Sequence, residues 1–214
     1  MTRFDAVVFD LDGTLCEHDQ DAEDVYFGAF ERAGLDPFGV PADLWAALDG
    51  PPDPRDRLGY LRDGFAAVAD RHGRGDADAD ALARAFDAVV DHGAVSFLDG
   101  AEEGLAAASD RAAVGLMTNG PEHRQSTKLT ALGLDDAFET VVFAGDMPRR
   151  KPHADPFDRT VAELSVSASS TLYVGNSLEY DVAGARGAGL PVAWCPEDGD
   201  TDPGEHDPED VLES

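Results

Sequence analysis

The sequence predicts an α/β protein, with a doubly wound parallel sheet and a helical domain inserted after the first strand. Short β-rich apolar runs alternate with helical patterns through the second half of the chain. Such alternation is typical of a parallel sheet with helices on both faces. The stretch 16–97 interrupts the alternation with helical patterns alone.

Five apolar runs fit strands that are buried on both faces of a sheet. They are 4–10, 112–120, 140–145, 171–177 and 191–195. Helical patterns follow the second, third and fourth runs, at 121–134, 155–164 and 177–190. Pro156 suits a first helical turn, and Gly189 suits a helix end. In open sheets of this kind, binding sites form beyond the carboxyl ends of the strands.

The inserted stretch contains no convincing strand. Two apolar faces with helical spacing recur in it, one through Leu58, Leu61, Phe65 and Val68 and one through Leu82, Phe86 and Val89. We therefore expect a core domain at 1–15 and 98–195, a helical domain at 16–97, and an acidic tail at 196–214.

The charge balance limits the partners of this protein. The chain has 44 acidic and 16 basic residues, and its formal net charge of −28 repels phosphodiester backbones and anionic lipids. Nucleic acid and membranes are therefore excluded as partners, and a small diffusible substrate is expected. Only Lys128 and Lys151 are lysines. This composition resembles that of proteins from salt-loving organisms, where the screening length in molar salt falls to roughly 3 Å.

The cysteine pattern and the N-terminus suggest a cytoplasmic protein. Cys16 and Cys195 have no disulfide or metal spacing, so both are expected to be small buried hydrophobes. No basic segment precedes an apolar one at the N-terminus, and no run approaches the length of a membrane span. The sequence makes no prediction of oligomeric state.

Asp10 and Asp12 end the first apolar run. Side chains two residues apart in extended backbone point the same way, so both carboxylates could face one site, where Gly13 lets the chain turn. Taken alone, the pattern is equally typical of an Asp-Gly turn on the surface.

Three later strand ends also carry polar groups. Thr118, Asn119 and Gly120 supply a hydroxyl, an amide and exposed N–H groups that can hold a phosphate, although ordinary capping loops look the same. Lys151 offers a compact ammonium for a phosphoryl oxygen, whereas Arg149 and Arg150 fit a solvated basic loop. Asn176 and Asp181 offer oxygen atoms for a hard cation, or alternatively a helix cap and an exposed acid.

These elements, in this order, resemble the motifs of the haloacid dehalogenase superfamily, most of whose members are phosphatases. The matching segments are Asp10-Leu11-Asp12-Gly13-Thr14, Thr118-Asn119-Gly120, Lys151-Pro152, and Gly175-Asn176-Ser177 through Asp181. The inserted helices resemble the family's α-helical cap on a Rossmann-like core. The segments after the second and fourth motifs look most like the branches of pyrimidine nucleotidases, sialic-acid phosphate phosphatases and phosphoglycolate phosphatases.

The resemblance implies a phosphomonoester hydrolase that acts on a small phosphorylated metabolite. Asp10 would attack phosphorus to give an aspartyl-phosphate, and Asp12 would protonate the leaving oxygen and then activate water. The phosphate oxygens would be held by Thr118, Asn119, Gly120 and Lys151.

The resemblance also implies a Mg²⁺ cofactor, held by the Asp10 side chain, the Asp12 main-chain carbonyl and an acid of the fourth motif. The chain departs from the pattern at Asn176, where the family usually has Asp. We predict that Asn176 remains a ligand, directly or through water, and that Asp181 supplies negative charge nearby. Weak magnesium binding is the expected consequence.

Asp12 favours phosphoryl chemistry over dehalogenation, because a halide leaves without a proton. Residues 16–98 contain no lysine, which excludes the imine chemistry of phosphonate-cleaving relatives. A phosphoglucomutase-like phosphotransferase stays open as an alternative. A non-catalytic binding protein on the same fold is the alternative from a different functional class.

Overall fold

The structure is a computed structural model that describes residues 4–48 and 56–196. The described residues form two compact units: a core unit of residues 4–17 and 95–196, and a helical unit of residues 18–48 and 56–94. The sequence predicts the corresponding boundaries at 15/16 and 97/98. Of the expected acidic tail, residues 197–214 lie outside the described part.

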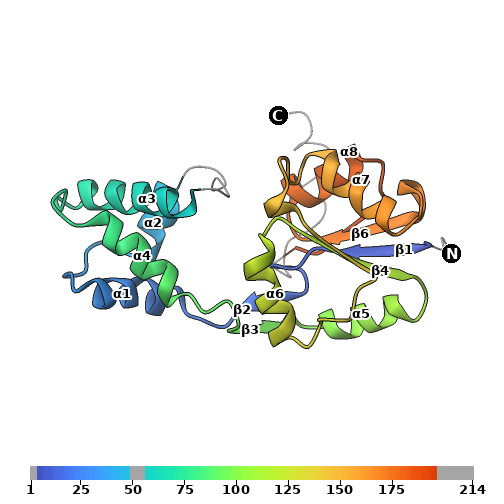
Figure 1. The fold of residues 1–214 in the computed structure, drawn as a ribbon, viewed down its shortest axis with the longest axis horizontal. Coiled ribbons are helices and arrows are strands. Elements are labelled where there is room, and N and C mark those ends of the chain that lie inside the picture. Colours follow the sequence, from blue (N-terminus) through green and yellow to red (C-terminus); the bar gives the residue numbers. More distant parts are fainter. Residues whose placement is uncertain (1–3, 49–55, 197–214) are drawn as a thin grey trace. The chain divides into compact units, whose positions relative to one another are not determined.

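The core unit contains a five-stranded parallel sheet (Figure 1). Its strands are β1 (Ala6–Phe9), β4 (Ala113–Thr118), β5 (Thr140–Phe143), β6 (Thr171–Gly175) and β7 (Val192–Trp194). The strand order is β5-β4-β1-β6-β7, so the chain builds one side of the sheet from β1 and then returns to build the other. β1 therefore lies at the switch point, where open parallel sheets place their sites. All five predicted strands are confirmed.

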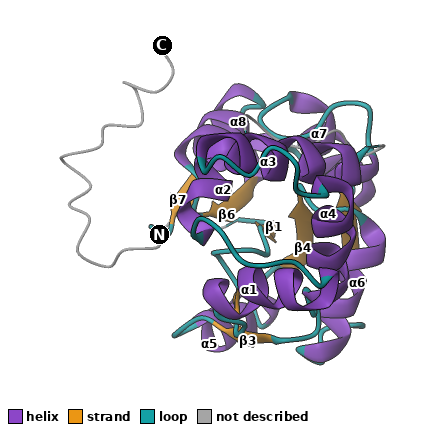
Figure 2. Ribbon diagram, turned by 90° about the vertical axis from the view of Figure 1, so that its left-hand side faces the viewer, coloured by secondary structure: helices purple, strands orange, loops and turns teal. Residues whose placement is uncertain are grey.

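Helices cover both faces of this sheet, as Figures 1 and 2 show. α5 (Ala101–Ser109) and α6 (Glu122–Ala131) cover one face, and α7 (Ala154–Glu163) and α8 (Gly184–Gly187) cover the other. Successive strand residues alternate between the two cores: Phe9 packs in the cluster of Leu105 and Leu129, whereas Val8 packs in the cluster of Phe157. Both faces of the strands are thus buried, which explains their continuous apolar character.

Short helical turns complete the core unit. Two 3₁₀ turns span η1 (Ala144–Asp146) and η2 (Ala168–Ser170). The helix predicted over 177–190 is instead a π-helical turn, η3 (Leu178–Ala183), followed by the short α8. Ser177 caps this turn, because its Oγ accepts a hydrogen bond of 3.1 Å from the Tyr180 N–H. Wide turns of this type are frequent at functional sites.

The helical unit consists of α1 (Ala22–Ala33), α2 (Pro41–Ala47), α3 (Arg57–Arg71) and α4 (Ala79–Val89). Its core is rich in aromatic rings, with Tyr26 stacked on Phe65 at a centroid distance of 5.9 Å. Both predicted helical faces form α3 and α4. Leu58 is the exception on α3, because it lies in the first turn and its surface is 43% exposed.

The prediction that 16–97 contains no strand is wrong. β2 (Cys16–His18) and β3 (Val95–Phe97) pair as a two-stranded sheet, each strand being too short to show a period in the sequence. Cys16 is buried as expected, but Cys195 is exposed, because it lies just beyond β7 where the chain leaves the sheet edge.

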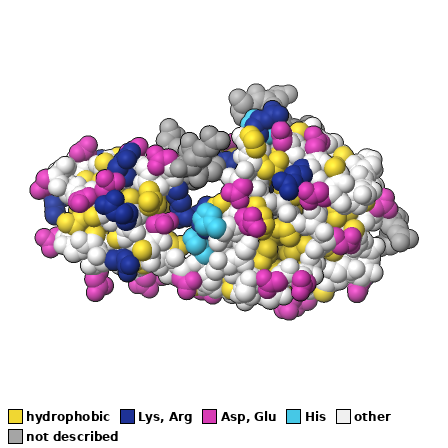
Figure 3. Space-filling view, viewed as in Figure 1, with side chains coloured by type: hydrophobic (Ala, Val, Ile, Leu, Met, Phe, Trp, Pro, Cys, Tyr) yellow, Lys and Arg dark blue, Asp and Glu magenta, His cyan; other side chains and the backbone are white. Residues whose placement is uncertain are grey.

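Two surface properties follow from the described residues. Acidic side chains are spread over the visible face of each unit and do not gather in one patch (Figure 3). Among the helices of residues 4–48 and 56–196, none combines the length and the apolar character needed to cross a bilayer.

Candidate active site

Asp10 follows β1 and is fixed by the sheet. Its N–H donates a hydrogen bond of 2.9 Å to the Val174 carbonyl of β6, which continues the strand pairing by one residue. The Asp10 side chain is buried. Two residues later, Asp12 precedes Gly13, whose φ of +76° provides the turn that an L side chain rarely adopts.

Lys151 places a buried ammonium group between two carboxylates. Its Nζ donates to Asp10 Oδ1 at 2.8 Å, to Asp181 Oδ1 at 2.6 Å and to the Tyr173 hydroxyl at 2.9 Å. An ammonium has three hydrogens, so these acceptors use all of them. Buried lysines and aspartates occur almost only as such pairs. Lys151 therefore belongs to a buried cluster of polar side chains. Its position is consistent with the prediction that Lys151, unlike Arg149 and Arg150, is more than part of a solvated loop.

Asp181 lies inside this site, not on the exposed face of a helix. Its Oδ2 accepts a hydrogen bond of 2.9 Å from the Ser177 N–H, and its Oδ1 also accepts from the Tyr173 hydroxyl at 3.0 Å. Gly175 makes room for it, because a Cβ at that position would lie 2.5 Å from Asp181 Cγ. The π-helical turn thus brings an acid of the fourth motif beside Lys151.

Tyr173 was not identified from the sequence. Its ring packs in the core against Phe157 with a centroid distance of 5.1 Å, and its hydroxyl joins Lys151 and Asp181. The signal in the sequence was a tyrosine in an otherwise apolar strand, because a buried phenol needs a polar partner.

Burial and neighbouring charges set the protonation of this cluster. Burial raises the pKa of Asp10 to about 6; the ammonium of Lys151 opposes the shift, and the charge of Asp181 adds to it. For Lys151, burial lowers the pKa, but Asp10 and Asp181 outweigh that effect and raise it overall. Burial also raises the pKa of Tyr173 well above its usual range, so this hydroxyl stays protonated and donates.

Two side chains of α6 hold the carboxylate of Asp12. Lys128 Nζ forms an ion pair with Asp12 Oδ1, and Gln125 Nε2 donates to Asp12 Oδ2 at 2.7 Å. Lys128 and Gln125 are both buried, whereas nearly half of the Asp12 side chain, 47%, is exposed. Neither α6 residue was identified from the sequence, although the scarcity of lysine pointed to Lys128 as much as to Lys151.

Thr118 ends β4 next to these groups. Its Oγ1 accepts from the Gly120 N–H at 3.1 Å and from Gln125 Nε2 at 2.7 Å. A Cβ at Gly120 would lie 2.3 Å from the Gln125 side chain, so a larger residue at position 120 would displace that side chain. The structure therefore connects Thr118 to Asp12 through one shared glutamine.

Asn119 has a different position from its neighbours. Its side chain pairs with the main chain of Lys151: Asn119 Oδ1 accepts from the Lys151 N–H at 2.9 Å, and Asn119 Nδ2 donates to the Lys151 carbonyl at 3.1 Å. These two hydrogen bonds hold the loop that carries Lys151 against the loop that carries Thr118. A phosphate contact through the main-chain amides of Asn119 and Gly120 stays a prediction.

Asn176 follows β6, as Asp10 follows the adjacent β1. Its Oδ1 lies 3.4 Å from the Thr14 hydroxyl, a long contact for a hydroxyl donor, and its main-chain carbonyl accepts from the Trp194 indole at 2.8 Å. No three His, Cys, Asp or Glu side chains within 4–48 and 56–196 are grouped as a metal site. The predicted set of magnesium ligands differs from such a group, because it combines two carboxylates with one side-chain amide and one main-chain carbonyl.

The donor chemistry of that set fits a hard cation, because all of its atoms are oxygens. The charges agree with this assessment. Asp10, Asp12 and Asp181 contribute three carboxylates to the site, and Lys128 and Lys151 contribute two ammonium groups. One negative charge is thus in excess before an anionic substrate binds.

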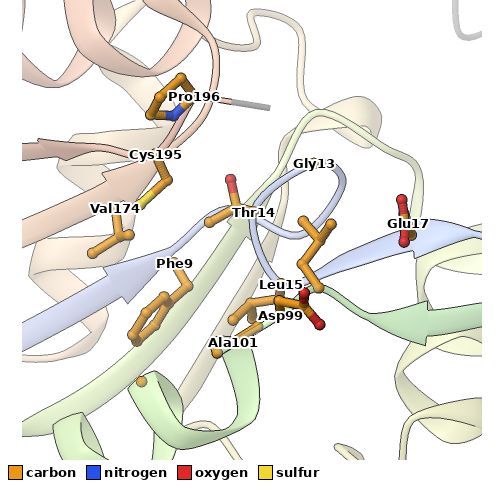
Figure 4. Close-up of a pocket in the computed structure, with 13 residues that line it drawn as sticks. Phe9, Gly13, Thr14, Leu15, Glu17, Asp99, Ala101, Val174, Cys195 and Pro196 are labelled. Carbon is orange, nitrogen blue, oxygen red and sulfur yellow. The ribbon is translucent and has the colours of Figure 1, made fainter. Parts of the chain in front are cut away.

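A pocket of about 610 Å³ lies in the core unit, on another side of the loop after β1. Figure 4 shows Val174 and Cys195 on one side of Thr14, and Leu15 and Glu17 on the other. Neither Asp10 nor Asp12 lines this pocket. Although Cys195 as a residue is exposed, partial burial of its thiol raises the pKa of this group, which argues against a thiolate nucleophile there.

Comparisons with known proteins agree with the geometry. A sequence model described as a haloacid dehalogenase-like hydrolase matches residues 4–189. A phosphoglycolate phosphatase of Xanthomonas campestris is 31% identical over 202 residues, which cover 92% of this chain and 87% of that protein. A glyceraldehyde 3-phosphate phosphatase of Pyrococcus abyssi is 32% identical over 81 residues, or 38% of this chain; here the chain spans only about a third, 34%, of the relative's length.

Among solved structures, the hydrolase YfnB of Bacillus subtilis, described as bound to magnesium, superposes with a TM-score of 0.69. Its sequence is 26% identical, and the match covers 90% of this chain and 88% of YfnB. The family model spans far more than half of the chain, and the carboxylate, hydroxyl and lysine of the predicted motifs meet at one edge of one parallel sheet. The chain therefore belongs to the haloacid dehalogenase-like hydrolase family.

Proposed function

We propose that this chain is a magnesium-dependent phosphatase that hydrolyses the phosphomonoester of a small metabolite through an aspartyl-phosphate at Asp10. The observation that carries the proposal is the buried Asp10 carboxylate held by Lys151 at 2.8 Å, with the second carboxylate, Asp12, held separately by α6. Two carboxylates in different surroundings can perform two different tasks.

The reaction has two in-line steps. The first step starts after Asp12, whose side chain is partly exposed, has taken up a proton from solvent. An Asp10 carboxylate oxygen then bonds to phosphorus, the ester P–O bond breaks, and Asp12 gives this proton to the leaving oxygen. In the second, a water oxygen bonds to phosphorus, Asp12 takes a proton from that water, and the bond between Asp10 and phosphorus breaks. The products are an alcohol and inorganic phosphate, and both carboxylates return to their initial state.

The phosphate oxygens are held by Thr118, Lys151 and the main-chain amides of Asn119 and Gly120. For this, Lys151 exchanges its hydrogen bond to Asp10, and the Gly120 N–H its bond to Thr118, for a bond to a phosphate oxygen. Thr118 Oγ1 already accepts two hydrogen bonds, so its own hydrogen can be donated to a phosphate oxygen. Lys151 supplies the compact positive charge that partly neutralises the Asp10 nucleophile and the incoming anion.

Mg²⁺ would be held by Asp10, by the Asp12 carbonyl and by Asn176, with Asp181 supplying charge nearby. When bound, this ion neutralises charge between the nucleophile and a phosphoryl oxygen. The proposal is supported by the all-oxygen donor set, by the excess carboxylate and by the magnesium-bound relative YfnB. Asp181 already binds Lys151 and Ser177, which suits a charge-supplying role more than direct ligation.

The substrate class that we propose is a small phosphorylated metabolite such as phosphoglycolate. Support comes from the Xanthomonas campestris relative, which aligns over 92% of this chain. The net charge of −28 disfavours polyanionic substrates. We also propose a cytoplasmic location in a salt-rich cell, because the acidic surface requires screening.

The test is phosphate release at high salt, with and without Mg²⁺ and a chelator. The panel contains phosphoglycolate, glyceraldehyde 3-phosphate, sugar phosphates and nucleoside monophosphates. We expect release from at least one compound, only with magnesium. Isomerisation of a sugar phosphate without release would instead indicate a phosphotransferase, and binding without any turnover would indicate a non-catalytic protein.

A further inference from the structure

The only two lysines of the chain are both buried, and each contacts one carboxylate of the catalytic pair. Lys151 contacts Asp10 and has a role in the proposed function. Lys128 contacts Asp12 and has none so far. All other basic residues are arginines, so a compact, flexible ammonium is kept only at these two places.

Lys128 and Gln125 lie one helical turn apart on α6 and therefore share a face of the helix. Together they contact both oxygens of Asp12, Lys128 at Oδ1 and Gln125 at Oδ2. A carboxylate held at both oxygens cannot rotate freely. Nearly half of the Asp12 side chain is exposed, so these two donors restrict its movement toward solvent.

Gln125 adds a second constraint. Its amide nitrogen has two hydrogens, and both are donated, one to Asp12 Oδ2 and one to Thr118 Oγ1, each at 2.7 Å. The hydroxyl proposed to hold a phosphate oxygen and the carboxylate proposed to protonate the leaving group are thus fixed to the same atom. Their separation is set by the protein before the substrate arrives.

We propose that Lys128 and Gln125 are positioning residues that aim the Asp12 carboxyl group at the leaving-group oxygen. This inference rests on the proposed phosphatase function. As Asp12 gives its proton away, negative charge develops on it, and two donors already in place stabilise that charge without reorganisation. Both residues are buried and contact Asp12 directly, so both act through Asp12.

A purely structural ion pair that fastens α6 to the loop after β1 would look similar in the folded protein. The two roles differ in their dependence on the leaving group. An alkyl phosphate such as phosphoglycolate needs a proton on its leaving oxygen, whereas the nitrophenolate of p-nitrophenyl phosphate departs without one. In the first step, a residue that aims the proton donor therefore matters for the first substrate and little for the second.

The experiment measures kcat/KM of Lys128→Met on both substrates at saturating magnesium, because kcat/KM reports the first step and not the later hydrolysis, which needs Asp12 for either substrate. We expect kcat/KM for phosphoglycolate to fall about 10²-fold and kcat/KM for p-nitrophenyl phosphate to fall by a few-fold at most. Gln125→Met should show the same selectivity, and Lys128→Arg should recover part of the loss. Thr127→Val, at an exposed neighbour on α6, is the matched control and should resemble the unmodified protein on both substrates.

Equal losses in kcat/KM on the two substrates, or no loss on either, would overturn the positioning role while leaving the phosphatase proposal intact. If Lys128→Met did not fold, Gln125→Met would decide the question, because it keeps the buried charge pair. If the unmodified protein released phosphate neither from these two substrates nor from any other compound of the panel, the proposed function would be wrong, and this inference would be wrong with it.

Discussion

The two lysine–carboxylate clusters differ most in their contact with solvent. Around Lys151, the side chains of the lysine, Asp10 and Asp181 are 2%, 9% and 1% exposed. Around Lys128, the lysine is 6% exposed but its partner Asp12 is 47% exposed. The difference matches the two tasks that we propose. A nucleophile benefits from a dry, fixed position, whereas a group that exchanges protons with the leaving oxygen and with water must face the solvent side.

The clusters also differ in how the protein holds them. Lys151 belongs to a loop that is fixed by the Asn119 side chain, and its ammonium has three protein acceptors. Lys128 is held by the regular turns of α6. Changes near Lys151 should therefore affect stability and catalysis together, whereas changes near Asp12 should affect mainly catalysis.

The largest expected effect is at Asp10. Asp10→Asn removes the nucleophile but keeps the shape, so we expect kcat to fall by at least about 10⁴-fold. Phosphate release with phosphoglycolate measures this, and the exposed Asp5→Asn serves as the matched control. Retention of more than a small fraction of turnover by Asp10→Asn would show that the covalent route is wrong.

The two clusters should differ most clearly in stability when the lysine of each is replaced. Lys151→Met should be the more destabilising change. It leaves Asp10 and Asp181 buried without their counter-ion, which costs about 3–5 kcal/mol of unfolding free energy. Lys128→Met should cost clearly less, because Asp12 can be solvated. Urea denaturation of both variants tests the order, and an equal loss in the two would contradict the comparison.

Tyr173→Phe is a smaller change to the Lys151 cluster than Lys151→Met. It keeps the packed ring and removes only the hydroxyl that accepts from Lys151 and donates to Asp181. We expect a loss of about 1–2 kcal/mol in unfolding free energy and a smaller decrease in kcat. Tyr180→Phe, outside this cluster, is a useful control. An unchanged midpoint of denaturation for Tyr173→Phe would mean that the hydroxyl contributes nothing to the cluster.

Asn176→Asp should have the smallest effect of these variants, and it tests the proposed Mg²⁺ ligands. An added carboxylate in the proposed magnesium set should tighten Mg²⁺ binding about tenfold, equivalent to about 1.4 kcal/mol. Isothermal calorimetry measures this without substrate or turnover. Thr127→Asp, at an exposed position of α6, controls for added charge alone. Equal affinity in Asn176→Asp and the unmodified protein would remove Asn176 from the proposed set.

The strands and the motif positions were predictable because the sequence shows both locally, the strands as apolar runs and the motifs as the polar residues after them. Strands buried on both faces read as continuous apolar runs, and the polar residues that follow them lie at one edge of a parallel sheet. The family resemblance then assigned the proposed roles. Short elements were missed, because β2 and β3 have three residues each and α5 buries only Leu105.

The supporting side chains could not be read from local patterns. Gln125 and Lys128 reach Asp12 across more than 110 positions of sequence, and Tyr173 reaches Lys151 across 22. Those pairings exist only after the sheet order is set. Lys128 is a partial exception, because the near absence of lysine from the sequence is enough to mark it as unusual.

The clasp between the Asn119 side chain and the Lys151 main chain has a practical meaning for engineering. The two loops behave as one part, since a shift in either carries the other with it. Anyone who transplants the segment 118–121 from a relative in order to alter selectivity should transplant 149–152 along with it. If only one segment were exchanged, the hydrogen bonds between residue 119 and the Lys151 main chain would be lost. The Lys151 ammonium would then be misplaced, although the Asn119 side chain does not contact it.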